Sequence, residues 1–294
     1  MNSASPAPGP GDFLKSWLQY PLPQHALSRL MHGLARSRNP WLRDRLLPWF
    51  AERYRLNLDE AEGEDLDDYA SLDELFTRRL VAGARPLEDA ALVSPVDGII
   101  SQLGRIEQDQ LFQAKARYFS LQDLLADDPE WRDFVDGHFA TLYLAPHHYH
   151  RVHMPITGTL TRLSHVPGRL FSVNPATTRG VHRLFSRNER VIARFDTEHG
   201  PVAAVLVGAL LVGSIETVWT GEITPPTRIG PRTLPLPRDK RQLTRRQGEE
   251  LGCFHMGSTV LLLTGHRAPP FLPELAPGHE LRMGQALMPR SHAD

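Results

Sequence analysis

The sequence has a single cysteine, Cys253, among its 294 residues, which excludes an internal disulfide framework and is compatible with a reducing compartment. It also lacks a long hydrophobic run. The longest candidate, 202–213, is shorter than the roughly 20 residues that a transmembrane helix needs. It also contains two glycines, so it predicts a buried strand. The N-terminus has no basic start followed by an apolar stretch, so we expect no signal peptide.

An excess of charge of either sign is absent as well. The chain has 33 Lys and Arg against 34 Asp and Glu, a net charge of −1, which excludes a globally basic nucleic-acid-binding protein. Hydrophobic residues make up 41% of the chain, enough to bury a core and unlike a disordered, collagen-like or coiled-coil sequence. The composition predicts a folded protein. Its unusual feature is 14 histidines, four of which lie within 147–153.

The N-terminal part of the chain divides into two stretches. Residues 1–11 are rich in Pro, Ala, Ser and Gly, and we expect them to be disordered. Residues 12–90 form a predicted helical region, in which apolar residues repeat at helical spacing and Ser71 with Glu74 resembles a capping box. The repeating residues are Leu27, Leu30, Met31, Leu34, Leu42, Leu46, Trp49 and Phe50.

Two interpretations of these N-terminal helices stay open from the pattern alone. Residues 11–50 contain six basic and two acidic side chains together with Trp17, Trp41 and Trp49. A basic, tryptophan-bearing amphipathic segment suits the surface of an anionic bilayer, where indole rings lie at headgroup level. The alternative is that both helices pack their apolar faces on the rest of the protein.

From residue 91 onward the pattern changes to short β-type runs separated by Gly and Pro. Helices followed by many short strands predict an α+β protein, with a mostly antiparallel β core over 91–294. The Pro-rich stretch 225–246 has seven basic residues and one acid, and is either a solvated linker or a patch that contacts phosphate headgroups. The expected strands are 98–103, 139–144, 158–163, 191–195, 202–212 and 258–263.

The densest group of chemically useful side chains comprises His147, His148, His150 and His153. Imidazole is a common zinc ligand, but the chain has no CxxC pair and no HExxH helix. Prolines at both ends of the stretch also exclude a long helix, so we expect no metal site there. Because imidazole titrates near neutrality, one or two of these histidines are candidates for proton transfer. An ordinary surface position is the alternative, first for His147 and then for His148.

Two further motifs carry little information when each is taken alone. Asp97 precedes Gly98 at the head of a predicted strand, and Asp-Gly is among the commonest turn pairs. Gly257 and Ser258 lead directly into an apolar strand, and Ser214 has the same local form. The chain contains no GxSxG motif, which argues against an α/β-hydrolase.

Taken in order, these motifs resemble the pyruvoyl-dependent phosphatidylserine decarboxylases of the bacterial type. The resemblance covers nearly the whole chain, from the N-terminal helices to GQAL near residue 287. Two departures are visible, since Met256 stands where the family usually has Leu and His148 where relatives often have Asp. The Leu-to-Met exchange conserves volume and should matter little. The motifs are SPVDGIISQLG, QAK, YLAPHHYHRVHMP, PGRLFSVNP, LFSRNERV, VGSIETVW, ITPP and FHMGSTV.

The resemblance implies a proenzyme that cuts itself between Gly257 and Ser258, into a beta chain of 1–257 and an alpha chain of 258–294. By the same comparison, Asp97 orients His153 and His153 activates Ser258, because a serine hydroxyl needs a base to become a nucleophile. We expect the missing Cβ of Gly257 to let the backbone take a strained conformation that exposes its carbonyl. Position 258 would then become a pyruvoyl group, the only cofactor implied.

The implied reaction is the decarboxylation of phosphatidylserine to phosphatidylethanolamine through a Schiff base with that pyruvoyl group. His150 is the candidate general acid for reprotonation, with a phosphate-contacting or orienting role as its alternative. The implied partners are phosphatidylserine, the membrane surface and the two self-cleaved chains joined as a heterodimer, with further homodimerisation left open and no nucleic acid. The implied location is the cytoplasmic side of the cell membrane, as a peripheral protein bound through region 12–90.

Two functions of other classes compete with this one. A soluble serine peptidase could use Asp97, His153 and Ser258 to cut other chains, and would keep Ser258 intact. A non-catalytic membrane-binding or metal-binding module could be built around the histidine stretch. The sequence assigns no role to Glu216, although it lies within one of the resembling motifs.

Overall fold

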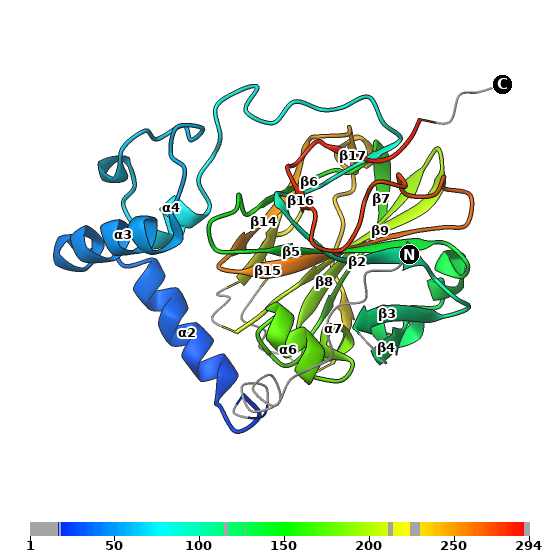
Figure 1. The fold of residues 1–294 in the computed structure, drawn as a ribbon, viewed down its shortest axis with the longest axis horizontal. Helices are drawn as coiled ribbons and strands as arrows, with labels where there is room; N and C mark the ends of the chain where they lie inside the picture. The colour runs from blue at the N-terminus through cyan, green and yellow to red at the C-terminus, as the bar shows by residue number, and fades with distance from the viewer. Residues whose placement is uncertain are drawn as a thin grey trace.

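The computed structural model describes residues 17, 19–114, 117–126, 128–210, 214–223 and 230–290 (Figure 1). Residues 1–11, which we expect to be disordered, and part of the 225–246 stretch lie outside these ranges. Helices near the N-terminus are followed by mostly antiparallel strands, which confirms the α+β prediction. None of the described helices combines the length and apolar character needed to cross a membrane.

Two of the N-terminal helices begin at residues whose side chains cap them. Helix α3 (Pro40–Tyr54) starts at Asn39, whose side chain accepts a hydrogen bond from the Trp41 amide, and has proline at its first position. Helix α4 (Leu72–Phe76) is capped by Ser71, which accepts from the Glu74 amide. The remaining helices are α2 (Gln24–Ala35), α5 (Leu121–Leu124), α6 (Pro175–Gly180) and α7 (Leu184–Arg187), with 3-10 turns at Leu66–Asp68, Trp131–Phe134 and Lys240–Gln242.

A large antiparallel sheet forms the centre of the molecule, in the order β12-β7-β8-β9-β15-β5-β2-β16, with β13 also paired to β7. Each strand predicted from the sequence lies in it, but β9 ends at Val207 rather than at 212. The chain leaves the sheet there, and the Gly208 amide bonds the Glu189 carbonyl. The bounds are β2 Gly98–Arg105, β5 His138–Leu144, β7 Gly158–Val166, β8 Arg190–Thr197, β9 Gly200–Val207, β12 Arg232–Thr233, β13 Thr244–Arg245, β15 Ser258–Thr264 and β16 Glu280–Leu281.

A second, four-stranded sheet packs beside the large one, in the order β11-β10-β14-β6. Apolar residues of both sheets, including Phe254, Leu142 and Val260, form one buried cluster. The bounds are β6 Arg151–His153, β10 Ser214–Thr217, β11 Gly221–Glu222 and β14 Glu250–His255; two small pairs are β1 Leu92–Val93 with β17 Ala286–Met288, and β3 Gln110–Ala114 with β4 Arg117–Ser120.

The part of the chain that follows Gly257 contributes two strands, β15 and β16, to the large sheet. Strand β15 lies in its interior, paired with β9 on one side and β5 on the other, and all seven of its residues are buried. A segment this short could not form a core alone. It must therefore fold together with the residues that precede it.

The N-terminal helices project from one side of the β core (Figure 1) and contact it largely through polar groups. In α2 the buried residues are Gln24, Ser28 and Ala35, and the Gln24 side chain accepts a hydrogen bond from the Leu170 amide. Its apolar residues Leu30 and Leu34 are instead exposed, at 61% and 38%. Leu27 and Met31 of the same stripe are half-buried, so the apolar stripe of α2 is exposed in part only.

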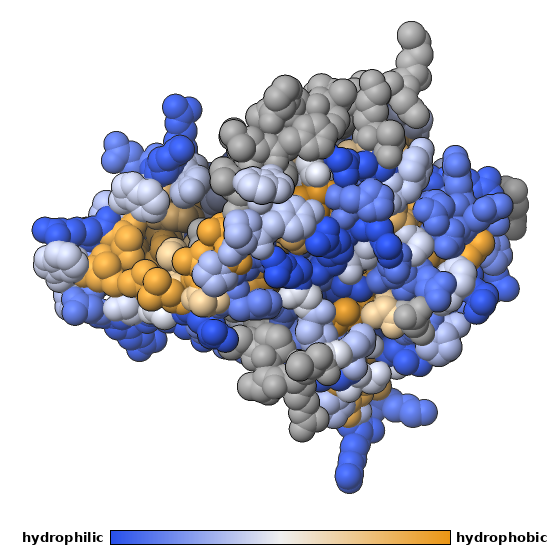
Figure 2. Space-filling model, turned by 90° about the horizontal axis from the view of Figure 1, so that it is seen from below, coloured by the Kyte–Doolittle hydropathy of each residue, from blue (hydrophilic) through white to orange (hydrophobic). Residues whose placement is uncertain are grey.

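Helix α3 is apolar on two sides. Leu47 and Phe50 are buried in a small core that also contains Phe76 of α4. Trp41 and Trp49 lie outward, 66% and 54% exposed. Figure 2 shows apolar surface gathered at the end of the molecule that these helices form.

Candidate active site

Ser258 lies where the chain passes from the small sheet to the large one. Strand β14 ends at His255 and β15 begins at Ser258, so only Met256 and Gly257 lie between these two strands. The Ser258 side chain is completely buried, and its Oγ has no hydrogen-bond partner among the described residues. Within the same ranges other buried hydroxyls, such as those of Ser214 and Thr259, also lack a partner, so it is the position of Ser258 at this connection that marks it as a candidate reactive group.

The backbone strain at this connection lies at Met256, which has a φ of 92°. Gly257 is not among the residues with positive φ, and a Cβ at Gly257 would meet open space. The sequence-based expectation placed the strain at Gly257 and was therefore wrong by one residue. A non-glycine residue with a positive φ costs of order 1–3 kcal/mol, so the backbone is strained next to the Gly257 carbonyl.

His153, at the end of β6, is a neutral base in this structure. Its Nδ1 lies 2.9 Å from the Gly248 carbonyl oxygen, which can only accept, so Nδ1 carries the proton and Nε2 has the free electron pair. Burial lowers the pKa of His153, and the Gly248 hydrogen bond and nearby carboxylates offset only part of that effect. Its Nε2 is thus available to take a proton at neutral pH.

The Tyr149 hydroxyl forms a hydrogen bond with His153 Nε2, at a distance of 3.0 Å. Burial raises the pKa of Tyr149, so the hydroxyl keeps its proton and donates it to the imidazole. The sequence analysis missed this residue. Its position within the histidine stretch, four residues before His153, was the only available signal.

Asp97 is held by Arg85 rather than by His153. The guanidinium donates to both carboxylate oxygens, at 2.6 to 3.1 Å, and the Met283 amide donates to Oδ1 at 2.8 Å. Burial opposes the charge of Arg85, but the hydrogen bonds to Asp97 raise its pKa. The Asp97 charge still acts on His153 electrostatically. The described contacts therefore place Asp97 near His153 without a hydrogen bond between them.

His150 is completely buried, and its ring lies against Phe76 with the centroids 3.9 Å apart. Nδ1 bonds the His148 carbonyl oxygen at 2.9 Å, which leaves Nε2 as an acceptor without a partner among the described residues. Burial lowers the pKa of His150 well below its usual range. The imidazole is neutral, and must take up a proton before it can act as an acid.

The other two histidines of the stretch differ in exposure. His147 is exposed, whereas His148 is buried and its Nδ1 accepts from the Ala145 amide at 2.9 Å. The Nε2 of His148 lies 3.3 Å from Glu280. Burial lowers the pKa of His148, which keeps this ring neutral.

The topology brings the predicted residues to one region of the molecule. Strand β14 pairs with β6, which carries His153, and the Phe254 amide donates to the His150 carbonyl oxygen at 3.1 Å. The Pro95 carbonyl accepts from the His153 amide, so the loop that holds Asp97 also contacts β6. His150 therefore lies beside the end of β14 that leads to Met256, whereas His153 pairs with Glu250 at the start of that strand. The described contacts join neither His153 nor Asp97 to Ser258.

Comparison with known proteins is consistent with these features. The family model described as phosphatidylserine decarboxylase matches residues 72–288, and one described as PSD matches residues 14–55. A protein of Ectopseudomonas mendocina named phosphatidylserine decarboxylase proenzyme is 50% identical to this chain, over 92% of this chain and 95% of its own length. A protein of the same name from Alkalilimnicola ehrlichii is also 50% identical, over 90% of this chain and 93% of its own length. One from Pseudomonas aeruginosa is also 50% identical, over 92% and 94%. This chain therefore belongs to the phosphatidylserine decarboxylase family.

Proposed function

We propose that this chain is made as a proenzyme, cuts itself between Gly257 and Ser258, and then decarboxylates phosphatidylserine to phosphatidylethanolamine. The observation that carries the proposal is the buried, unpartnered Ser258 hydroxyl beside the strained Met256 backbone, in a chain of this family. A serine placed this way suits attack on the peptide bond that precedes it.

Self-cleavage needs only atoms of this chain. His153 Nε2 takes the proton of Ser258 Oγ, and Oγ attacks the carbonyl carbon of Gly257. A C–O bond forms, the C–N bond between the two residues breaks, and His153 returns the proton to the departing amine. Asp97 stabilises the imidazolium while it is charged. Loss of the Cα proton of residue 258 then expels the Gly257 carboxylate, and water converts the remaining dehydroalanine to pyruvoyl and ammonia.

The site suits a pyruvoyl group at position 258. Ser258 Oγ departs with the Gly257 carboxylate, and because this oxygen makes no hydrogen bond to the described residues, its loss breaks none. The group supplies an electrophilic carbonyl that acts as an electron sink for decarboxylation. The buried Nε2 of His150 can hold a proton and return it to the α carbon of the product, which is the role that we propose for His150.

A membrane-resident substrate also explains the exposed leucines of α2, Leu30 and Leu34, and the exposed tryptophans of α3. We propose that these two helices bind the bilayer surface as a peripheral anchor. The exposed residues Leu30, Trp41 and Trp49 would enter the interface, and basic side chains such as Arg45, which lies 4.3 Å over the Trp41 ring, would meet anionic headgroups. The cytoplasmic face of the cell membrane remains the expected location.

Intact mass and product analysis test the function as a whole. The proposal predicts two fragments divided after residue 257, the smaller blocked to Edman sequencing by its terminal ketone, and release of CO₂ from phosphatidylserine vesicles. A peptidase predicts one uncut chain with an intact Ser258. A binding module predicts neither cleavage nor CO₂.

Replacing Tyr149 with Phe should speed self-cleavage. The change frees His153 Nε2 from a neutral hydrogen bond worth about 1 kcal/mol, which corresponds to an acceleration of roughly fivefold. Fragment formation can be followed by gel densitometry after rapid synthesis of the chain. Tyr143→Phe in β5 is the matched control. Slower cleavage in Tyr149→Phe would mean that the hydroxyl holds the imidazole in its working position.

The pH dependence of self-cleavage should follow the lowered pKa of His153. A base acts in its neutral form, and a histidine with a pKa below its ordinary value stays neutral to lower pH. The midpoint of the fall in rate should therefore lie below about pH 6.5, the ordinary value for histidine. A decline that is already half complete at about pH 7 would contradict a buried, neutral His153.

A further inference from the structure

A second group of chemically useful side chains lies on β10 and β14, just before the cleavage position. Cys253 and His255 are two residues apart on β14, so their side chains share one face of the sheet. Glu216 of β10 is the cross-strand partner of Cys253. Three different potential metal ligands thus meet on one face.

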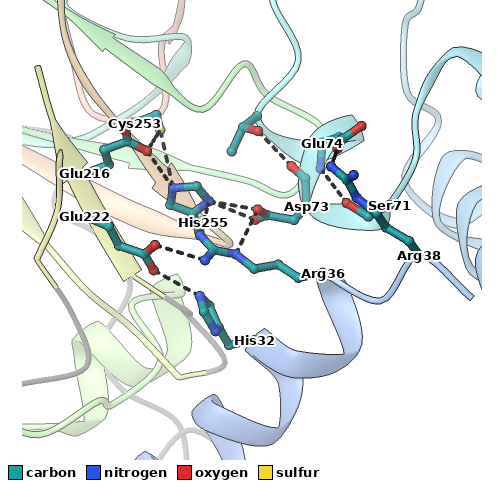
Figure 3. A network of polar contacts seen from close by, with 11 residues as sticks. His32, Arg36, Arg38, Ser71, Asp73, Glu74, Glu216, Glu222, Cys253 and His255 are labelled. Atoms are coloured by element: carbon teal, nitrogen blue, oxygen red, sulfur yellow. Dashed lines mark hydrogen bonds and ion pairs between the residues drawn. The ribbon is translucent and has the colours of Figure 1, made fainter.

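The spacing of their ligand atoms is that of one face of a tetrahedral site (Figure 3). His255 Nε2 lies 3.1 Å from Glu216 Oε2, and Cys253 Sγ lies 3.7 Å from each of those two atoms. Zinc bonds of about 2.0–2.3 Å at tetrahedral angles give separations of roughly 3.3–3.6 Å between ligand atoms. Small side-chain shifts would bring all three atoms to one ion.

Asp73 of α4 orients the imidazole for this purpose. Its carboxylate oxygens lie 2.9 and 3.1 Å from His255 Nδ1, and Arg36 holds the same carboxylate at 3.1 Å. Protein zinc sites use this arrangement, in which a carboxylate accepts from one imidazole nitrogen and the other nitrogen binds the metal. Asp73 lies far from His255 in the sequence, so the fold alone provides the pairing.

The site is open on one side. The Glu216 side chain is 44% exposed, whereas that of His255 is only 9% exposed, so an ion could enter past the glutamate and keep a water as its fourth ligand. Two anionic ligands and a neutral imidazole would balance the charge of a divalent ion.

We propose that Glu216, Cys253 and His255 bind a divalent ion of the zinc class, with Asp73 as the positioning residue for His255. The ion would fasten β10 to the end of β14 and so fix the strand that leads to Met256. This role is structural, lies outside the decarboxylation chemistry, and does not depend on it.

An ion-pair network is the competing state of the same residues. Burial opposes a charge on His255, but hydrogen bonds to Asp73 and Cys253 raise its pKa to about 10. A metal ion must therefore displace the Nε2 proton that bridges to Glu216, and must also deprotonate the thiol. Only a direct titration separates the two states.

Cobalt(II) titration of the chelator-stripped, full-length protein tests the proposal. Because Cys253 is the only cysteine, a thiolate-to-cobalt charge-transfer band can arise from this residue alone. We expect that band to saturate at one equivalent, to disappear on addition of zinc, and to be absent in Cys253→Ser. Asp73→Asn should keep the band and weaken binding roughly 10- to 100-fold.

His147→Ala is the matched control, because His147, His148 and Glu280 form the other potential ligand group within the described residues. It should leave the cobalt titration unchanged. A wild-type protein that shows no thiolate band, or binding that is unaltered by Cys253→Ser, would overturn the proposal and leave an ion-pair network only. The wild-type titration decides the question even if a variant does not fold.

Discussion

Replacing Ser258 with alanine should leave the chain uncut. The change removes the nucleophile, so the cleavage rate should fall by at least about 10⁴-fold, and decarboxylation should be lost with it. Folding should be unaffected, because Ser258 Oγ makes no hydrogen bond within the described residues and the backbone pairing of Ser258 with Leu144 does not depend on the side chain. Intact mass spectrometry of the purified protein measures the outcome.

Ser214→Ala is the matched control for this experiment. Ser214 has a similar local sequence, is buried to 1% exposure and begins β10, where it pairs with His255. It is therefore a second buried hydroxyl close to the cleavage position, but it lies outside the peptide bond that is cut. We expect normal processing in that variant. Fragments divided after residue 257 in Ser258→Ala would show that another group attacks the peptide bond, and the proposed self-cleavage would be abandoned.

His153→Ala should also abolish processing, because it removes the imidazole that we propose as the base for Ser258. His153→Gln is the informative companion, since its amide can still bond Tyr149 or Gly248 but cannot act as a base at neutral pH. Both variants should therefore fold and remain uncut. Processing that survives either change would remove His153 from the mechanism.

Exchanging Leu30, Trp41 and Trp49 together for serine should abolish binding to phosphatidylserine vesicles. Each side chain contributes about 1 kcal/mol when partly buried in the interface, so the combined loss corresponds to a partition coefficient lower by roughly 100-fold. Self-cleavage should continue, because these residues do not contact the site. Vesicle sedimentation measures binding, and CO₂ release should fall for vesicles but persist for a short-chain, water-soluble phosphatidylserine.

The control variant changes three exposed residues outside the N-terminal helices. These are Leu87, Tyr118 and Val218, which are 46%, 49% and 39% exposed. Serine at these three positions should leave vesicle binding intact. Point changes are preferable to deleting residues 12–50, because Leu47 and Phe50 form a core with Phe76 and deletion would expose it. Unchanged sedimentation of the Leu30, Trp41 and Trp49 variant would eliminate these helices as the anchor.

Elements set by short-range patterns could be predicted from the sequence. The apolar spacing of 27–34 and 42–50 and the cap at Ser71 became helices close to the expected bounds, and the short β-type runs 98–103 and 258–263 became strands. These features depend on backbone preferences and on neighbours within a few residues. The α+β class followed from their order along the chain.

The site was predictable only as a set of motifs. His150, His153, Asp97 and Ser258 could be selected because long motifs resembled one family, but their contacts could not. Three of these residues contact a partner that is separated from them in the sequence. Arg85 contacts Asp97, Gly248 contacts His153, and Phe76 contacts His150. Such pairings depend on how strands and loops are brought together.

The sequence by itself determined the helices, the strands and the residue that begins β15, because local periodicity and turn chemistry act over a few residues. Only the tertiary structure decided that Leu30 and Leu34 of α2 stay exposed, that strain lies at Met256, and that Asp73 contacts His255. Each of these depends on which surfaces pack together when two sheets and three helices meet. A linear pattern does not contain that choice, because the same stripe or charge could pair with several partners.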